Sequence, residues 1–367
     1  MKVPYINLGL QHANLMNELL AATGKVLGSG QFILGDEVSK FENRFSQLCQ
    51  TRYALGVANG TDALILSLKA LGISEGDEVI TAPNSFLASA SAIALTGATP
   101  VFADVRSDFN LDPEKVEKAI SKKTKAVIAV HLTGRPAPMD ELLSLSQKHK
   151  IAVIEDCAQS VGAEYKGKRT GGFGITGCFS LHPLKNLAAA GDGGVITTND
   201  ESIYKYLLKA RNHGLKNRDE CEFWGYNSRL DSLQAALLNV KLDYLDKWTG
   251  RRREIARFYH DKLQSLNIAL PGEKPYEKAV YHTYIIQCNE RDALKEYLAA
   301  KGIETKIHYP VPIHLQEAAK YLGYRKGDFP VTEKQIETIL SLPVYPELTK
   351  EEVGYVADSI IEFYNKK

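Results

Sequence analysis

Four residue types that could serve one cofactor follow one another near the middle of the chain. Asp156 ends an apolar run at 151–156, Gln159 follows it, Ser180 ends a later apolar run, and Lys185 comes shortly after. A lysine can form a Schiff base with an aldehyde, and a carboxylate can keep a pyridine nitrogen protonated so that the ring accepts electrons. An acid and a lysine in this arrangement favour pyridoxal 5'-phosphate as the cofactor.

Each of these residues also has an ordinary interpretation. Asp156 alone could cap a helix or hold a magnesium ion, because ligands gather at the carboxyl ends of strands in α/β proteins. Lys185 is one of 45 basic residues, and most lysines are exposed surface charges. The segment 178–184 before Lys185 is largely apolar, however, and desolvation there would lower the pKa of the lysine and supply the neutral amine that a nucleophile needs.

A candidate phosphate site lies at Gly60 and Thr61. Residues 53–58 are typical of a strand and residues 61–71 of an apolar helix. Gly60 and Thr61 would then stand where free backbone N–H groups and the helix dipole attract phosphate. Taken alone, the same segment could be an ordinary turn in which Asn59 or Thr61 caps the helix.

Three runs of sequence resemble a known family. Glu155-Asp156-Cys157-Ala158-Gln159, the run from Phe179 to Leu187, and Gly191-Asp192-Gly193-Gly194 are similar to segments of the nucleotide-sugar aminotransferases of the DegT/DnrJ type, a branch of the aspartate aminotransferase fold (fold type I). The resemblance covers nearly the whole chain. It implies that Asp156 partners the pyridine nitrogen, Gln159 donates to the ring hydroxyl, Ser180 binds the cofactor phosphate at the turn of Gly60 and Thr61, and Lys185 is the Schiff-base lysine and proton carrier.

The resemblance adds two further cofactor-binding residues and a partner. It implies that Phe86 stacks on the cofactor ring, although a core phenylalanine is an equally ordinary interpretation. It also implies that Asn227, in Gly225-Tyr226-Asn227-Ser228-Arg229, reaches the cofactor phosphate of a neighbouring subunit. A homodimer is therefore expected.

The activity that the resemblance implies consists of two half-reactions at one site. An amino acid, expected to be L-glutamate, aminates the cofactor, and the amino group then passes to a keto sugar linked to a nucleotide diphosphate, dTDP or UDP. Lys185 argues against the dehydratase branch, which has histidine there. Asp192 is similar to members that aminate carbon 3 of a 3-keto sugar, while Ala188-Ala189-Ala190 departs from the usual glycine. Amination at carbon 4, a lyase reaction, and non-catalytic binding of a cofactor or sugar nucleotide are the alternatives.

Four more residues are candidates for substrate contacts. His182 precedes Lys185 by three positions, and His308, Tyr309 and His314 lie together in the C-terminal part. Each could equally be an ordinary wall residue. Two glycine-rich motifs are decoys: 162–168 has P-loop spacing but is followed by Arg169, and 172–177 fits the dinucleotide fingerprint but leads into a strand.

Composition excludes several classes of function. The formal net charge is +1, with 45 basic and 44 acidic residues, so nucleic acid and anionic membrane are not expected partners. No apolar segment is long enough to span a bilayer, and the first residues lack a signal-peptide core. The five scattered cysteines and nine histidines show no metal-binding spacing, so we expect no metal and a cytoplasmic location.

The expected fold is α/β, with a mostly parallel, mixed seven-stranded sheet, flanking helices and a smaller C-terminal α+β domain. Strands are predicted near 53–58, 78–82, 100–104, 126–131, 151–156, 178–182 and 193–198. The chain between 182 and 193 is too short for a crossover helix, so one antiparallel neighbour is expected. Residues 1–245 should form the large cofactor domain and 246–367 the small one. In the latter we expect strands at 281–286 and 303–309 and helices at 291–301 and from Thr349.

Overall fold

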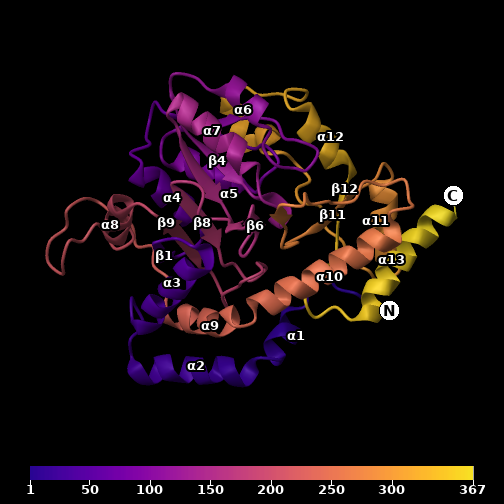
Figure 1. Ribbon diagram of the computed structural model, residues 1–367, viewed down its shortest axis with the longest axis horizontal. Helices are drawn as coiled ribbons and strands as arrows, with labels where there is room; N and C mark the ends of the chain where they lie inside the picture. Colours follow the sequence, from indigo (N-terminus) through magenta and orange to yellow (C-terminus); the bar gives the residue numbers. More distant parts are fainter. Residues whose placement is uncertain (367) are drawn as a thin grey trace.

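The computed structural model describes residues 1–366 and is built around one mixed sheet (Figure 1). Its order is β1-β9-β8-β5-β4-β2-β3, and only β9 runs antiparallel to its neighbours. The predicted seven-stranded, mostly parallel sheet is confirmed, as is the antiparallel strand after the short lysine turn. The strands are β1 (Tyr53–Val57), β2 (Glu78–Thr81), β3 (Thr99–Phe102), β4 (Thr124–Val130), β5 (Ala152–Asp156), β8 (Thr176–Ser180) and β9 (Gly194–Thr198).

Helices cover both faces of this sheet, because successive strand residues point to opposite sides. Ile154 and Ile196 pack in the core with α4, α5 and α8, whereas Val153 and Val195 pack on the other face, which α3, α9, α6 and α7 cover. The helices of this part are α1 (Leu8–Ala13), α2 (Met16–Ser29), α3 (Asp36–Cys49), α4 (Gly60–Ala70), α5 (Leu87–Leu95), α6 (Pro113–Ala119), α7 (Met139–His149), α8 (Glu201–Ala210) and α9 (Ser232–Leu242), with the 3-10 turn η1 (Leu132–Gly134).

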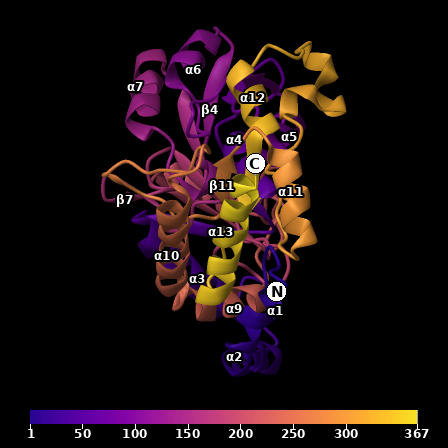
Figure 2. The same cartoon turned by 90° about the vertical axis from the view of Figure 1, so that its right-hand side faces the viewer.

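The C-terminal elements form a separate hydrophobic core beside the sheet (Figures 1 and 2). The long helix α10 leads into it, and Val3 belongs to it too, because the Val3 N–H donates to the Gly302 carbonyl (2.9 Å). The predicted division at residue 245 therefore stays a prediction. The elements are α10 (Leu245–Leu263), β11 (Tyr284–Gln287), α11 (Arg291–Ala300), η2 (Ile313–Leu315), η3 (Glu317–Leu322), α12 (Pro330–Thr338), β12 (Ile339–Leu342) and α13 (Lys350–Asn365), with a small sheet of β6 (Glu164–Tyr165), β7 (Lys168–Arg169) and β10 (Glu277–Lys278).

Local sequence signals explain some C-terminal boundaries and fail at one. Thr349 caps α13 in a reciprocal box with Glu352, as Thr-x-x-Glu predicts. The predicted strand at 303–309 is wrong. Ile303 pairs with Val3 and Lys306 with Ser341, so the segment bridges two partners one residue at a time and no continuous ladder forms. Among residues 1–366, no helix is both long and apolar enough to cross a membrane.

Candidate functional site

Four of the predicted cofactor residues lie along one edge of the sheet. Strands β1, β8, β5, β4 and β2 run in the same direction, so their carboxyl ends lie along one edge, which is where open α/β sheets bind ligands. This edge carries Gly60 after β1, Ser180 at the end of β8, Asp156 at the end of β5, and Phe86 shortly after β2.

Asp156 is a buried carboxylate with few partners. One oxygen accepts from the Ser89 hydroxyl (2.9 Å) and the other from the Ala158 N–H (3.1 Å). Burial raises the pKa of Asp156, and these hydrogen bonds together with the charge of Lys185 oppose the rise. A protonated pyridine nitrogen is the kind of cation that would stabilise this carboxylate in its charged form.

Lys185 lies on the short turn between β8 and β9. Its N–H donates to the His182 carbonyl (2.8 Å), which fixes the turn. The side chain is half-buried, and desolvation lowers the pKa of Lys185 to about 8, although the Asp156 carboxylate opposes the shift. A much larger share of neutral amine is therefore present near neutral pH than an exposed lysine would provide.

The turn after β1 and the end of β8 form one surface. The Asn59 side chain caps α4 by accepting from the Asp62 N–H (2.8 Å). A Cβ atom on Gly60 would lie 2.8 Å from Ser180 Cβ and 3.1 Å from Ser180 Cα. The close contact needs glycine, and it sets Ser180 against the N-terminus of α4, where phosphate is favoured.

We expect Gly60→Ala to weaken binding of pyridoxal 5'-phosphate by about 10-fold, because the new methyl group would push Ser180 away from the helix N-terminus. A titration of the cofactor-free protein with pyridoxal 5'-phosphate measures this affinity. Gly354→Ala in α13 is the matched control, since its Cβ would meet nothing within 4 Å. The control should bind normally and gain up to about 1 kcal/mol of stability. Normal binding by Gly60→Ala would contradict the role of this contact.

Gln159, Phe86 and Tyr309 lie together across the site. The Gln159 side-chain oxygen accepts from the Thr133 N–H (2.7 Å), and its amide nitrogen donates to the Tyr309 hydroxyl (3.3 Å). The Phe86 and Tyr309 rings are 5.7 Å apart. Phe86 is 54% exposed, so its ring is free to stack on a ligand, as the prediction requires.

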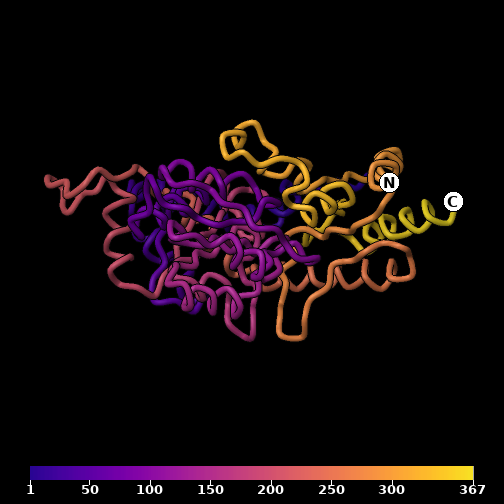
Figure 3. The backbone as a smooth tube through the Cα atoms, turned by 90° about the horizontal axis from the view of Figure 1, so that it is seen from above, coloured from indigo at the N-terminus to yellow at the C-terminus, as the bar shows by residue number. Residues whose placement is uncertain are grey.

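The structure brings some of the candidate substrate residues to the site and leaves others away from it. His308 is close enough to Lys185 that the lysine charge contributes, after burial, to lowering the pKa of His308 to about 4. His182 is exposed beside the lysine turn. His314 is 2% exposed, bonded to Glu333 (3.1 Å) and packed on Phe329, and no contact joins it to the other site residues. Asn227 is exposed on the segment between α8 and α9, which extends from the body (Figure 3).

Sequence reasoning missed three residues of the site. Ser89 in α5 forms a hydrogen bond with Asp156. Asn186, which directly follows Lys185, forms one with His282 (3.2 Å). Asn186 stands in the motif that carried the resemblance, so its position was a usable signal. Ser89 and His282 gave none, because each lies far along the chain from the residue it serves.

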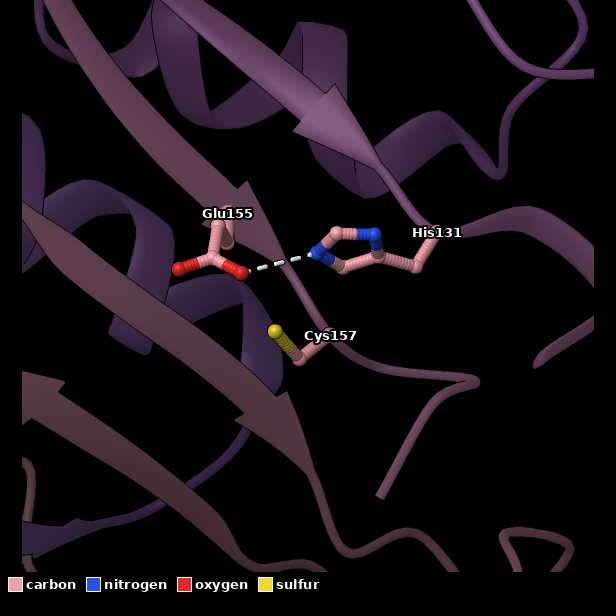
Figure 4. A group of neighbouring side chains, drawn as sticks. All are labelled: His131, Glu155 and Cys157. Atoms are coloured by element: carbon pink, nitrogen blue, oxygen red, sulfur yellow. Dashed lines mark hydrogen bonds and ion pairs between the residues drawn. The ribbon is translucent and has the colours of Figure 1, made fainter. Parts of the chain in front are cut away.

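A buried group beneath the site holds the strand ends in place (Figure 4). The Ala137 N–H donates to His131 Nδ1 (2.8 Å), so His131 Nε2–H donates to Glu155 (3.0 Å). Glu155 also accepts three backbone N–H groups, from Gly171, Phe173 and Gly174 (2.7–2.8 Å). The glycine-rich motif at 172–177 therefore surrounds the Glu155 carboxylate and does not bind a dinucleotide phosphate in the way its spacing suggests. Burial raises the pKa of Cys157 well above its usual value, and neither His131 nor Glu155 offers a nitrogen or oxygen without a partner to a metal.

The residues fit pyridoxal 5'-phosphate. A buried carboxylate, an amine with a low pKa and a glycine turn at a helix N-terminus match the pyridine nitrogen, the aldehyde and the phosphate of that cofactor. Asp156 ends β5, Lys185 lies on the turn after β8, and Gly60 lies on the turn after β1 of the same sheet. Binding of this cofactor gives a reason for Lys185 and Asp156 both to be desolvated in the same site.

Comparison with known proteins gives a consistent result. A model of the DegT/DnrJ/EryC1/StrS aminotransferase family matches residues 14–361. The structure of DesV from S. venezuelae in complex with a ketimine intermediate superimposes with a TM-score of 0.97 at 41% identity, covering 99% of this chain and 98% of that one.

Three curated relatives match along almost their whole length. A dTDP-3-amino-3,4,6-trideoxy-alpha-D-glucose transaminase from Streptomyces venezuelae is 41% identical, covering 99% of this chain and 96% of the relative. A UDP-N-acetyl-3-dehydro-alpha-D-glucosamine 3-aminotransferase from Acidithiobacillus ferrooxidans is 42% identical, covering 98% and 97%. A protein from Geobacillus stearothermophilus named a pleiotropic regulatory protein is 42% identical, covering 99% of both chains.

Proposed function

Because the chain belongs to the DegT/DnrJ/EryC1/StrS aminotransferase family, we propose that it transfers an amino group from L-glutamate to carbon 3 of a 3-keto sugar linked to dTDP or UDP. The chain is a pyridoxal-phosphate-dependent aminotransferase. The observation that carries the proposal is the desolvated, electrostatically interacting pair of Asp156, at the end of β5, and Lys185, on the turn after the neighbouring strand β8. The names of the transaminase relatives support the choice of sugar and of carbon 3.

Each site residue of this chain has a separate role in the amino transfer. Bound pyridoxal 5'-phosphate supplies a carbonyl that carries the amino group and a ring that accepts electrons. Asp156 holds a proton at the ring nitrogen, Gln159 orients the ring, and Gly60 and Ser180 anchor the phosphate. The Lys185 amine, whose pKa desolvation lowers to about 8, accepts and returns the proton that moves between the amino-bearing carbon of the substrate and the cofactor. A protein that only binds the sugar would need no such lysine.

Two half-reactions should be observable separately. Cofactor-loaded protein mixed with L-glutamate alone should release about one 2-oxoglutarate per site, because the amino group stays on the enzyme. Adding a UDP- or dTDP-linked 3-keto sugar should then give an amino sugar, detected by mass spectrometry, and restart 2-oxoglutarate release. Amination of a 4-keto sugar in preference to the 3-keto sugar would overturn the assignment to carbon 3. Absence of 2-oxoglutarate would overturn glutamate as the donor.

A homodimer with shared sites is part of the proposal. The arm at residues 212–227 lies between α8 and α9 and carries exposed aromatic side chains: Trp224 is 96% exposed and Tyr226 is 40% exposed. Ser228, at the base of the arm, donates to Asp62 in the phosphate-side helix α4 (2.7 Å). An exposed aromatic arm next to a phosphate site is well placed to contact a second copy.

A cytoplasmic location remains a prediction.

Mixing two inactive variants tests the shared site. If Asn227 acts on the neighbouring subunit, hybrid dimers of Lys185→Ala and Asn227→Asp contain one site with both defects and one with neither. An equimolar mixture, dissociated and reassociated, should recover about one quarter of wild-type activity. Each variant treated alone is the control and should stay inactive. Activity that remains at the level of the separate variants would show that Asn227 serves its own subunit.

A further inference from the structure

The amide of Asn186 places a proton on Nδ1 of His282. The Asn186 side-chain nitrogen donates to the Val280 carbonyl (3.2 Å), and a carbonyl can only accept. The Asn186 oxygen must then face His282, where it accepts from Nδ1 (3.2 Å). His282 therefore carries a proton on Nδ1, and in the neutral imidazole Nε2 then carries a lone pair that can only accept a hydrogen bond.

The surroundings of His282 hold this state. Burial, followed by the charges of Lys185 and Arg252 and by His308, lowers the pKa of His282 well below its usual value. Arg252 also donates to the backbone carbonyls of Tyr281 (3.2 Å) and His282 (3.4 Å). The imidazole therefore stays uncharged over the pH range in which Lys185 changes its protonation.

The turn η1 (Leu132–Gly134) holds both the segment that carries His282 and the side chain of Gln159. The Val280 N–H donates to the Gly134 carbonyl (3.0 Å), and the neighbouring Thr133 N–H holds the Gln159 side chain (2.7 Å). A Cβ atom on Gly134 would lie 3.0 Å from the backbone nitrogen of His282, so the two segments are in close contact. This places His282, which comes from the C-terminal part, at the wall of the cofactor site beside Lys185.

We propose that His282 is a substrate-positioning residue whose Nε2 accepts a hydrogen bond from a hydroxyl group of the keto sugar. His282 Nε2 has no hydrogen-bond partner in the part of the chain that the structure describes, and it is not among the fully buried polar atoms without one. An acceptor that stays unprotonated suits a hydroxyl donor and cannot bind the carboxylates of glutamate, which also only accept. His282 should therefore act in the sugar half-reaction. This inference rests on the proposed function.

Two substitutions separate this role from a purely structural one. His282→Asn keeps an N–H that can donate to Asn186 but has no atom at the position of Nε2. His282→Gln places an amide oxygen near the position of Nε2 and loses the donor to Asn186. A role for Nε2 predicts that Gln restores the sugar half-reaction and Asn does not, whereas a structural role predicts the reverse.

We would measure both half-reactions by single-turnover absorbance in cofactor-loaded enzyme, and the affinity for the amino-sugar product by calorimetry. His282→Asn should slow the sugar half-reaction and weaken product binding by about 10- to 100-fold, with His282→Gln close to wild type and glutamate turnover within about twofold in both. Equal slowing of both half-reactions, or rescue by Asn and not by Gln, would overturn the inference. Wild-type enzyme that does not use a keto sugar would instead contradict the proposed function.

Discussion

Lys185→Ala should shift the absorption of bound pyridoxal 5'-phosphate from that of a lysine Schiff base to that of the free aldehyde, and lower transaminase activity by roughly 10,000-fold or more, because it removes both the amine that bonds the cofactor and the base that moves the proton. Lys185→Arg is the matched control. It keeps a cation near Asp156 but provides no nucleophile, so it should be as inactive as the alanine variant while preserving the charge of the site. Substantial activity in either variant would contradict the role of Lys185.

The low pKa of Lys185 adds a pH test of the same residue. The neutral amine is the nucleophile, and raising the pH removes its proton. The rate at which cofactor-free protein combines with pyridoxal 5'-phosphate should therefore rise with pH and reach half its maximum near pH 8, since the pKa of Lys185 is lowered from 10.5 to about 8. Stopped-flow absorbance measures this rate. A rate that still climbs steeply above pH 9 would show that the amine is not desolvated.

The residues at the strand ends were predictable because each ends or directly follows an apolar run. A strand candidate locates its own carboxyl end, and a parallel sheet brings such ends together, so Asp156 and Ser180 needed only local information. Gly60 was found in the same way, through the strand-to-helix turn. The resemblance to known aminotransferases supplied their roles.

Residues brought in by packing were not predictable. His282 reaches the lysine turn because Val280 docks on Gly134, and nothing near residue 282 in the sequence reports that contact. His314 fails for the opposite reason: the 3-10 turn η2 directs it to Glu333 and Phe329, although it lies close to His308 in sequence. The strand expected at 303–309 had the right composition, but Ile303 pairs with Val3 and Lys306 pairs with Ser341. Because the two partners differ, no continuous strand forms.

Asp156→Asn should lower activity by roughly 1,000-fold or more while leaving the fold intact. An asparagine of the same shape can accept from the Ala158 N–H with its oxygen and donate from its NH2 group to the Ser89 hydroxyl, but it carries no charge to hold a proton at the pyridine nitrogen. Because burial raises the pKa of Asp156, replacing it with a neutral amide also removes a desolvation cost. The cofactor-free variant should therefore melt at the same temperature as wild type or higher.

Ser89→Ala provides a graded comparison at the same carboxylate. It removes one hydrogen bond and leaves the charge, so activity should fall only about 5- to 10-fold. The two variants together separate the charge of Asp156 from its position, with thermal melting as the check on folding. An Asp156→Asn variant that is as active as Ser89→Ala would mean that Asp156 positions the cofactor through hydrogen bonding alone, and that the ring nitrogen does not need a negative partner in this enzyme.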